Sequence, residues 1–131
     1  MAGAVQDGRG EGVMQERPIL EDKGRDTVLC ALADLEDPGS KGFRVGRRER
    51  LFVIRKGDAV FGYMNLCPHQ GTTLDWKEDA FLTVEKDFII CATHAAHFEI
   101  ETGLCTWGPC LGRSLAPIKM RVENGLIMLD E

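Results

Sequence analysis

The sequence contains no apolar run that approaches 18 residues, the length that a membrane-spanning helix requires. Residues 1–12 are rich in glycine and hold no apolar core of signal-peptide length. Lysine and arginine number 16 against 21 aspartates and glutamates, and the resulting net charge of −5 argues against nucleic acid as the main partner. We therefore expect a cytoplasmic protein with no membrane span and no nucleic-acid partner.

A long helical period, an internal repeat and a low-complexity segment are also missing. Short stretches rich in β-branched and aromatic residues alternate instead with turns that contain glycine. The expected strands are residues 27–32, 43–45, 51–55, 59–66, 88–91, 97–100, 115–122 and 126–129. Together they predict one all-β, antiparallel domain over residues 26–131. Residues 1–25, in which charged residues and glycine dominate, predict a flexible N-terminal lead-in.

Histidine is rare, and two of the three histidines stand in short pairs with cysteine. Cys67 and His69 form a C-x-H pair, and Cys91 and His94 form a C-x2-H pair after a gap of 21 residues. Both pairs follow expected strands, so a rigid sheet would hold the two loops at a fixed distance. Two thiolates and two imidazoles suit either a tetrahedral zinc ion or a [2Fe–2S] cluster of mixed ligation.

The residues around these pairs resemble the Rieske [2Fe–2S] family. Residues 67–74 match the first box of the family, C-x-H-x-G-x-x-L, and Cys91, His94 and Phe98 match its second box, C-x-x-H-G-x-x-F. Residues 108–109, Gly-Pro, resemble the loop that covers the cluster in the family. The resemblance implies a Rieske-like antiparallel β-sandwich with a small cluster-binding subdomain carried on loops. It also implies one [2Fe–2S] cluster with four ligands, Cys67, His69, Cys91 and His94.

Three features of the boxes differ from the family or from its high-potential members. Ala95 stands where the family has glycine, at a position where a positive φ imposes a steric cost on alanine. Thr72 and Thr93 occupy the positions of a disulfide found in the high-potential members, and Ala96 replaces a serine that donates a hydroxyl to the cluster. Because hydrogen bonds to the sulfurs favour the reduced cluster, we expect a midpoint potential in the lower part of the Rieske range.

The remaining cysteines and the third histidine have simpler interpretations. We expect Cys30, Cys105 and Cys110 to be reduced and mostly buried thiols, with a redox-active pair of Cys105 and Cys110 as the alternative. His97 is interpreted as a residue at the start of a strand, because its spacing from Cys91 is too wide for the second box.

Five acidic residues between the boxes could steer a basic partner surface or form a solvated loop. They are Asp75, Glu78, Asp79, Glu85 and Asp87.

The resemblance implies a single-electron carrier between a flavin-dependent reductase and a terminal oxygenase or other redox protein. A Rieske oxygenase also needs a mononuclear iron on two histidines and a carboxylate, and only His97 remains for that purpose. We therefore expect no catalysis on this chain. Two alternatives stay open: the small subunit of a larger oxidoreductase, similar to that of assimilatory nitrite reductase, and a zinc-stapled interaction domain.

Overall fold

The computed structural model of the chain describes residues 18–46, 49–68, 73–75, 79–91 and 95–131. Its strands are β2 (Ile19–Leu20), β3 (Val28–Ala31), β4 (Gly39–Val45), β5 (Glu49–Lys56), β6 (Ala59–Met64), β7 (Ile89–Cys91), β8 (Ala96–Phe98), β9 (Cys105–Trp107), β10 (Pro117–Ile118), β11 (Met120–Glu123) and β12 (Leu126–Leu129). Two single 3₁₀ turns, η2 (Gly24–Asp26) and η3 (Leu32–Asp34), flank β3. Within the described ranges there is no α-helix, and no helix is long and apolar enough to cross a membrane. The all-β prediction is confirmed.

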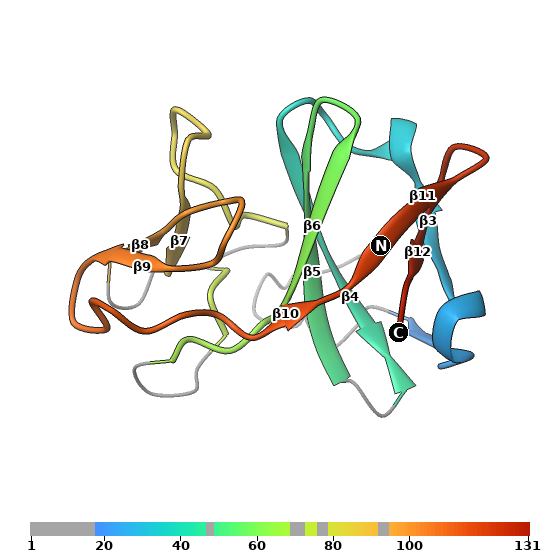
Figure 1. Cartoon of the computed structure of the whole chain (residues 1–131), viewed down its shortest axis with the longest axis horizontal. Helices are drawn as coiled ribbons and strands as arrows, with labels where there is room; N and C mark the ends of the chain where they lie inside the picture. The colour runs from blue at the N-terminus through green and yellow to red at the C-terminus, as the bar shows by residue number, and fades with distance from the viewer. Residues whose placement is uncertain (1–17, 47–48, 69–72, 76–78, 92–94) are drawn as a thin grey trace, which may run out of the picture.

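The strands form three sheets. A central sheet has the order β10-β6-β5-β4-β2, and two three-stranded sheets have the orders β11-β12-β3 and β7-β8-β9. In Figure 1 the central sheet separates the sheet of β7, β8 and β9 from the sheet of β3, β11 and β12. Among the described residues, neighbouring strands are antiparallel except β2 and β4, which are parallel. The expected subdomain is therefore present, and it has a small sheet of its own beneath its loops.

Strand β5 explains this arrangement, because it is buried on both faces. Phe52 and Ile54 belong to the core shared with the β7-β8-β9 subdomain, whereas Leu51 and Val53 belong to the core shared with the C-terminal strands. All four side chains are fully buried. Successive residues of a strand point to opposite faces of a sheet, so this continuous apolar run serves two cores. The central sheet thus supports the subdomain on one face.

Residues 115–122, expected as one strand, form two. Pro117 pairs with Tyr63 in the central sheet, and Met120 pairs with Leu129 in the C-terminal sheet. The chain changes sheets at Lys119, whose carbonyl accepts a hydrogen bond from the Asp130 N–H at 2.8 Å.

The structure also contains two strands, β2 and β9, that were not expected from the sequence. Both are short, and their sequences carry little alternation of apolar and polar residues.

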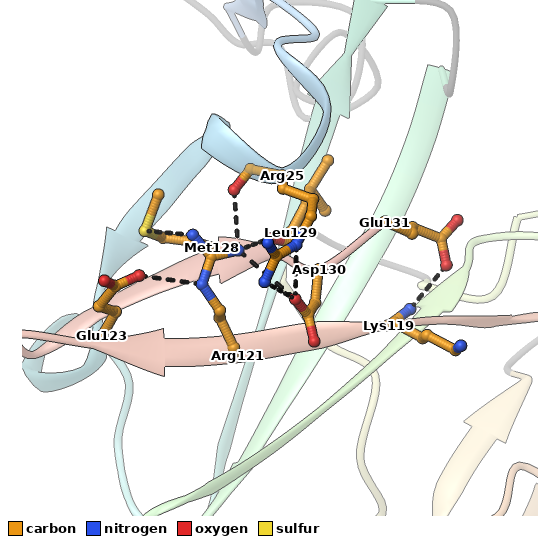
Figure 2. A network of polar contacts seen from close by, with 8 residues as sticks. All are labelled: Arg25, Lys119, Arg121, Glu123, Met128, Leu129, Asp130 and Glu131. Atoms are coloured by element: carbon orange, nitrogen blue, oxygen red, sulfur yellow. Dashed lines mark hydrogen bonds and ion pairs between the residues drawn. The ribbon is translucent and has the colours of Figure 1, made fainter.

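The C-terminus is fixed to the start of the fold by a polar network (Figure 2). The Arg25 side chain donates hydrogen bonds of 3.0 and 2.7 Å to Asp130 Oδ1. The Arg121 guanidinium donates to the Arg25 carbonyl at 2.8 Å and to Glu123 Oε1 at 3.0 Å. These contacts join η2 to the hairpin of β11 and β12. Residues 1–17 of the expected lead-in lie outside the described residues.

Candidate metal centre

Cys67 lies on a loop that Asn65 closes. The loop follows β6, and the Asn65 side chain is almost completely buried at its start. Asn65 Oδ1 accepts a hydrogen bond from the Leu74 N–H at 2.8 Å, and Asn65 Nδ2 donates to Asp75 Oδ1 at 3.1 Å. One side chain therefore connects the beginning of the first box to its end. Leu74, the last residue of the box, is itself fully buried in the core.

Cys91 is the last residue of β7, and the second loop returns the chain to β8. The Ala95 N–H donates a hydrogen bond to the Cys91 carbonyl at 2.7 Å, and Cys91 pairs with Ala96 across the hairpin. Ala95 has a φ of 58°, in the left-handed region. The backbone therefore adopts the conformation expected where the family has glycine, and alanine bears its steric cost.

A third segment, residues 107–111, packs against Ala96 at the start of β8; we call it the covering loop. Gly108 has a φ of 112°, and a Cβ built on it would lie 2.7 Å from the Ala96 Cα. Such a close approach of two backbones requires glycine. Arg113, just beyond the covering loop, donates a hydrogen bond from Nη1 to the Pro68 carbonyl at 3.0 Å. Pro68 lies between the two residues of the first C-x-H pair, so the covering loop is joined to both boxes.

The two predicted cysteine ligands meet in one core. Cys67 and Cys91 are fully buried and belong to the same hydrophobic cluster, although Cys67 lies on the loop after β6 and Cys91 is the last residue of β7. Buried thiols on neighbouring loops suit a soft metal ion such as iron in an iron–sulfur cluster or zinc. The predicted ligands His69 and His94 lie outside the described residues.

Cys30, Cys105 and Cys110 form no disulfide in the structure. Cys105 and Cys110 are buried in the same cluster, and Cys110 Sγ donates a hydrogen bond to Cys105 Sγ at 3.1 Å. Burial and the contact with Cys105, together with the nearby Cys67, raise the pKa of the Cys110 thiol to about 12. Cys30 is half-buried against the other core, and burial raises its pKa to about 11.

Three further residues singled out in the sequence, His97, Asp79 and Asp87, have structural partners. His97 is in β8, where its ring stacks on Phe88 at 5.6 Å and contacts Trp107 at 5.5 Å between centroids. Asp79 accepts a hydrogen bond from the Gly42 N–H at 2.8 Å. Asp87 accepts one from the Thr83 hydroxyl at 2.7 Å, so at least these two acidic side chains have local structural contacts. Glu78 lies outside the described residues.

Sequence reasoning missed Asn65, Tyr63 and Arg113. The buried Tyr63 hydroxyl donates to the Ile100 carbonyl at 2.6 Å and so joins β6 to the subdomain. Burial raises its pKa to about 12. An asparagine directly after a strand is a known signal for side-chain contacts to a loop backbone, and it could have identified Asn65. The partners of Tyr63 and Arg113 are distant in sequence and leave no such signal.

An all-β domain in which two loops present buried thiols beside a glycine–proline covering loop fits the class of small metal-binding domains, including iron–sulfur domains. The model of the Rieske [2Fe–2S] domain matches residues 26–122, and the chain belongs to this family. A Rieske domain binds one [2Fe–2S] cluster, which is therefore the cofactor of this protein. No curated protein matches the sequence.

Solved structures with the same fold include two ferredoxins. The ferredoxin of carbazole 1,9a-dioxygenase from Nocardioides aromaticivorans IC177 is 26% identical, with a TM-score of 0.65 over 78% of this chain and 93% of that one. The ferredoxin of Sphingomonas yanoikuyae B1 is also 26% identical, with a TM-score of 0.64 over 79% of this chain and 96% of that one. The quaternary ammonium Rieske monooxygenase CntA, at 21% identity and a TM-score of 0.63, shares the fold over 79% of this chain and 30% of its own. The chain is thus an electron-transfer protein similar to Rieske-type ferredoxins.

Proposed function

We propose that this protein carries single electrons in the cytoplasm, from a flavin-dependent reductase to an oxygenase-type acceptor. The proposed ligands of its [2Fe–2S] cluster are Cys67, His69, Cys91 and His94. The observation that supports this proposal is the meeting of Cys67 and Cys91, one from each box, fully buried in one core. The similarity to a ferredoxin that forms a complex with the oxygenase of carbazole 1,9a-dioxygenase supports the acceptor class.

The cluster, when bound, accepts and releases one electron. The chain contributes ligands, a dry environment and a path to the surface. Cys67 and Cys91 are enclosed by apolar neighbours such as Phe98 and Leu115, which exclude water from their sulfurs. Low solvent exposure and the lack of a hydroxyl at Ala96 both disfavour the reduced cluster, which carries one more negative charge. A midpoint potential in the lower part of the Rieske range follows.

Exposed apolar side chains near these loops suit a docking partner. Leu66, adjacent to Cys67, is 49% exposed, and Trp107 and Leu111 at the ends of the covering loop are 60% and 66% exposed. Large exposed apolar groups that come from neighbouring loops favour a protein contact. The Arg113–Pro68 hydrogen bond holds the two loops together, so a partner would meet Leu66 and the covering loop as one surface.

Imidazole ligands give this proposal a distinctive pH dependence. Loss of a ring proton from an oxidised-state His69 or His94 adds negative charge beside the cluster, so reduction becomes harder. The midpoint potential should be flat at acidic pH and fall by about 59 mV per pH unit once one imidazole titrates. Protein-film voltammetry between pH 5 and pH 11 measures this slope. A potential that is flat over the whole range would contradict histidine ligation.

The carrier function is tested by anaerobic reductive titration followed by electron transfer. The protein should take up one electron per cluster, accept it from NADH through a flavin-dependent ferredoxin reductase, and pass it to cytochrome c as a probe acceptor. Cys67→Ser should abolish the visible chromophore, whereas Cys30→Ser, which changes a thiol in the other core, should keep it. A colourless protein with one zinc per chain would contradict the proposal in favour of the zinc-stapled domain. Isolation from the native host only as a stoichiometric complex with a large oxidoreductase would favour the small-subunit alternative.

A further inference from the structure

Cys105 and Cys110 form a close pair of buried thiols beside the metal centre. Their Sγ atoms are 3.1 Å apart, and each residue is 1% exposed. Cys105 Sγ also donates a hydrogen bond to the Trp107 carbonyl at 3.3 Å. Neither cysteine belongs to the four proposed cluster ligands, so electron transfer through the cluster gives the pair no role.

The backbone keeps the two thiols together. The Cys105 N–H donates to the Arg113 carbonyl at 2.7 Å, and the Arg113 N–H donates to the Cys110 carbonyl at 2.8 Å. The Gly112 N–H donates to the Cys105 carbonyl at 3.2 Å. A disulfide requires a sulfur separation of about 2.05 Å, so the two sulfurs must approach by about 1 Å to close the bond. The pair is held close to bonding geometry by the segment that joins it.

No other cysteine competes for this pairing. Cys30 packs against the core on the other face of the central sheet. Cys67 and Cys91 are the proposed cluster ligands and would be occupied by iron. Burial restricts access to a small oxidant, for which hydrogen peroxide is the simplest chemical class.

We propose that Cys105 and Cys110 form a reversible dithiol–disulfide site that braces the covering loop. The raised pKa of Cys110 disfavours its thiolate, so the attacking sulfur is that of Cys105. It attacks a peroxide oxygen, the O–O bond breaks, and a sulfenic acid and one water result. The second sulfur then displaces the hydroxyl of the sulfenic acid, so that the S–S bond forms and a second water leaves. Two thiols are oxidised and one peroxide is reduced, and the two thiol protons end in the waters. A dithiol reductant returns the disulfide to two thiols by thiol–disulfide exchange and is itself oxidised to a disulfide.

Oxidation has a structural consequence at the covering loop. It removes the S–H donor that Cys105 offers to the Trp107 carbonyl and covalently links the start of β9 to the residue after Pro109. The loop that carries the exposed Trp107 is then closed by a covalent bond at its base. The site does not depend on the identity of the electron-transfer partner.

Mass spectrometry of the holoprotein tests the proposal. The protein is treated with low doses of hydrogen peroxide while the cluster absorbance is monitored, then denatured with an alkylating reagent and digested with trypsin. Residues 87–113 form one tryptic peptide with Cys91, Cys105 and Cys110. We expect this peptide to carry one alkyl group, on Cys91. Its mass should be lower by two hydrogens than that of the same singly alkylated peptide with two free thiols. Fragment ions should locate the bond between Cys105 and Cys110.

Thermal unfolding supplies a second readout. The oxidised protein should melt on the order of 5 °C above the reduced protein, because the closed loop restricts the unfolded chain. Cys105→Ser, which keeps a hydroxyl near the Trp107 carbonyl, should remove this difference, and Cys30→Ser should retain it. Three results would overturn the proposal. The first is full alkylation of Cys105 and Cys110 after oxidation, and the second is a disulfide from either of them to Cys67 or Cys91. The third is a disulfide that forms only after the cluster absorbance is lost. If Cys105→Ser does not fold, the wild-type peptide masses decide alone.

Discussion

Asn65→Ala is predicted to loosen the first ligand loop and to destabilise the protein. The substitution removes the acceptor of the Leu74 N–H and the donor to Asp75 Oδ1. The Leu74 N–H is in a buried hydrogen bond, so losing its partner costs about 1–3 kcal/mol. The lost hydrogen bond to a carboxylate adds about 1.5–3 kcal/mol. The free energy of unfolding should therefore fall by about 2.5–6 kcal/mol.

Thermal unfolding, followed by circular dichroism, measures this effect. A loss of this size lowers the melting temperature by on the order of 10 °C in a domain of this length. Loss of cluster absorbance to an iron chelator should also become faster, because Cys67 lies on the loop that Asn65 closes. Thr106→Ala, which truncates an exposed side chain of β9, serves as the control and should change neither quantity.

Asn65→Asp separates the two hydrogen bonds of Asn65. A carboxylate still accepts from the Leu74 N–H, but it cannot donate to Asp75 and it brings two like charges together. Its stability should fall at neutral pH and recover when the carboxylates are protonated. A melting temperature of Asn65→Ala within about 2 °C of the wild type would refute the reasoning. Even the smallest expected loss of unfolding free energy would lower the melting temperature by more than about 2 °C.

Three further substitutions test the loops and the C-terminal network. Ala95→Gly should raise the free energy of unfolding by about 0.5–1 kcal/mol in denaturant titrations, because glycine relieves the φ of 58° at some entropic cost. Gly108→Ala should lower the free energy of unfolding by about 2–4 kcal/mol and speed cluster loss, because the alanine Cβ would meet the Ala96 Cα. Unchanged kinetics of cluster loss to a chelator would contradict this prediction. The hydrogen bond from Arg25 lowers the pKa of Asp130 in the folded protein. The Asp130 carboxylate therefore stabilises the fold fully above the normal aspartate pKa, and this stabilisation is lost as the pH falls through the pKa of the folded state. Asp130→Asn should therefore melt below the wild type at pH 7 and equal it near pH 2, and a difference that persists at pH 2 would point to a cause other than charge.

Much of the fold could be predicted from local pattern. The hairpin of β11 and β12 follows from Asn124-Gly125, and Asn124 has the positive φ that such a turn needs. The run around β5 identified a buried strand, but local sequence could not show that its two faces serve separate cores. The change of sheet at Lys119 depends on partners more than 50 residues away in β6, so an apolar stretch alone could not reveal it.

The sequence also predicted part of the candidate site. Spacing identified Cys67 and Cys91, and the structure brings them into one core. The conformation of Ala95 agrees with the expectation for its position in the second box. The clamp made by Asn65 and the bridge from Arg113 to Pro68 depend on side chains that meet only after folding. His69 and His94 remain predicted ligands.

The measurement that tests the central claim most directly is an EPR spectrum of the anaerobically purified protein after reduction with dithionite. A [2Fe–2S] cluster with two cysteine and two histidine ligands predicts a red-brown protein and a rhombic signal whose average g value lies below the free-electron value. A colourless, EPR-silent protein that contains one zinc per chain would contradict the claim.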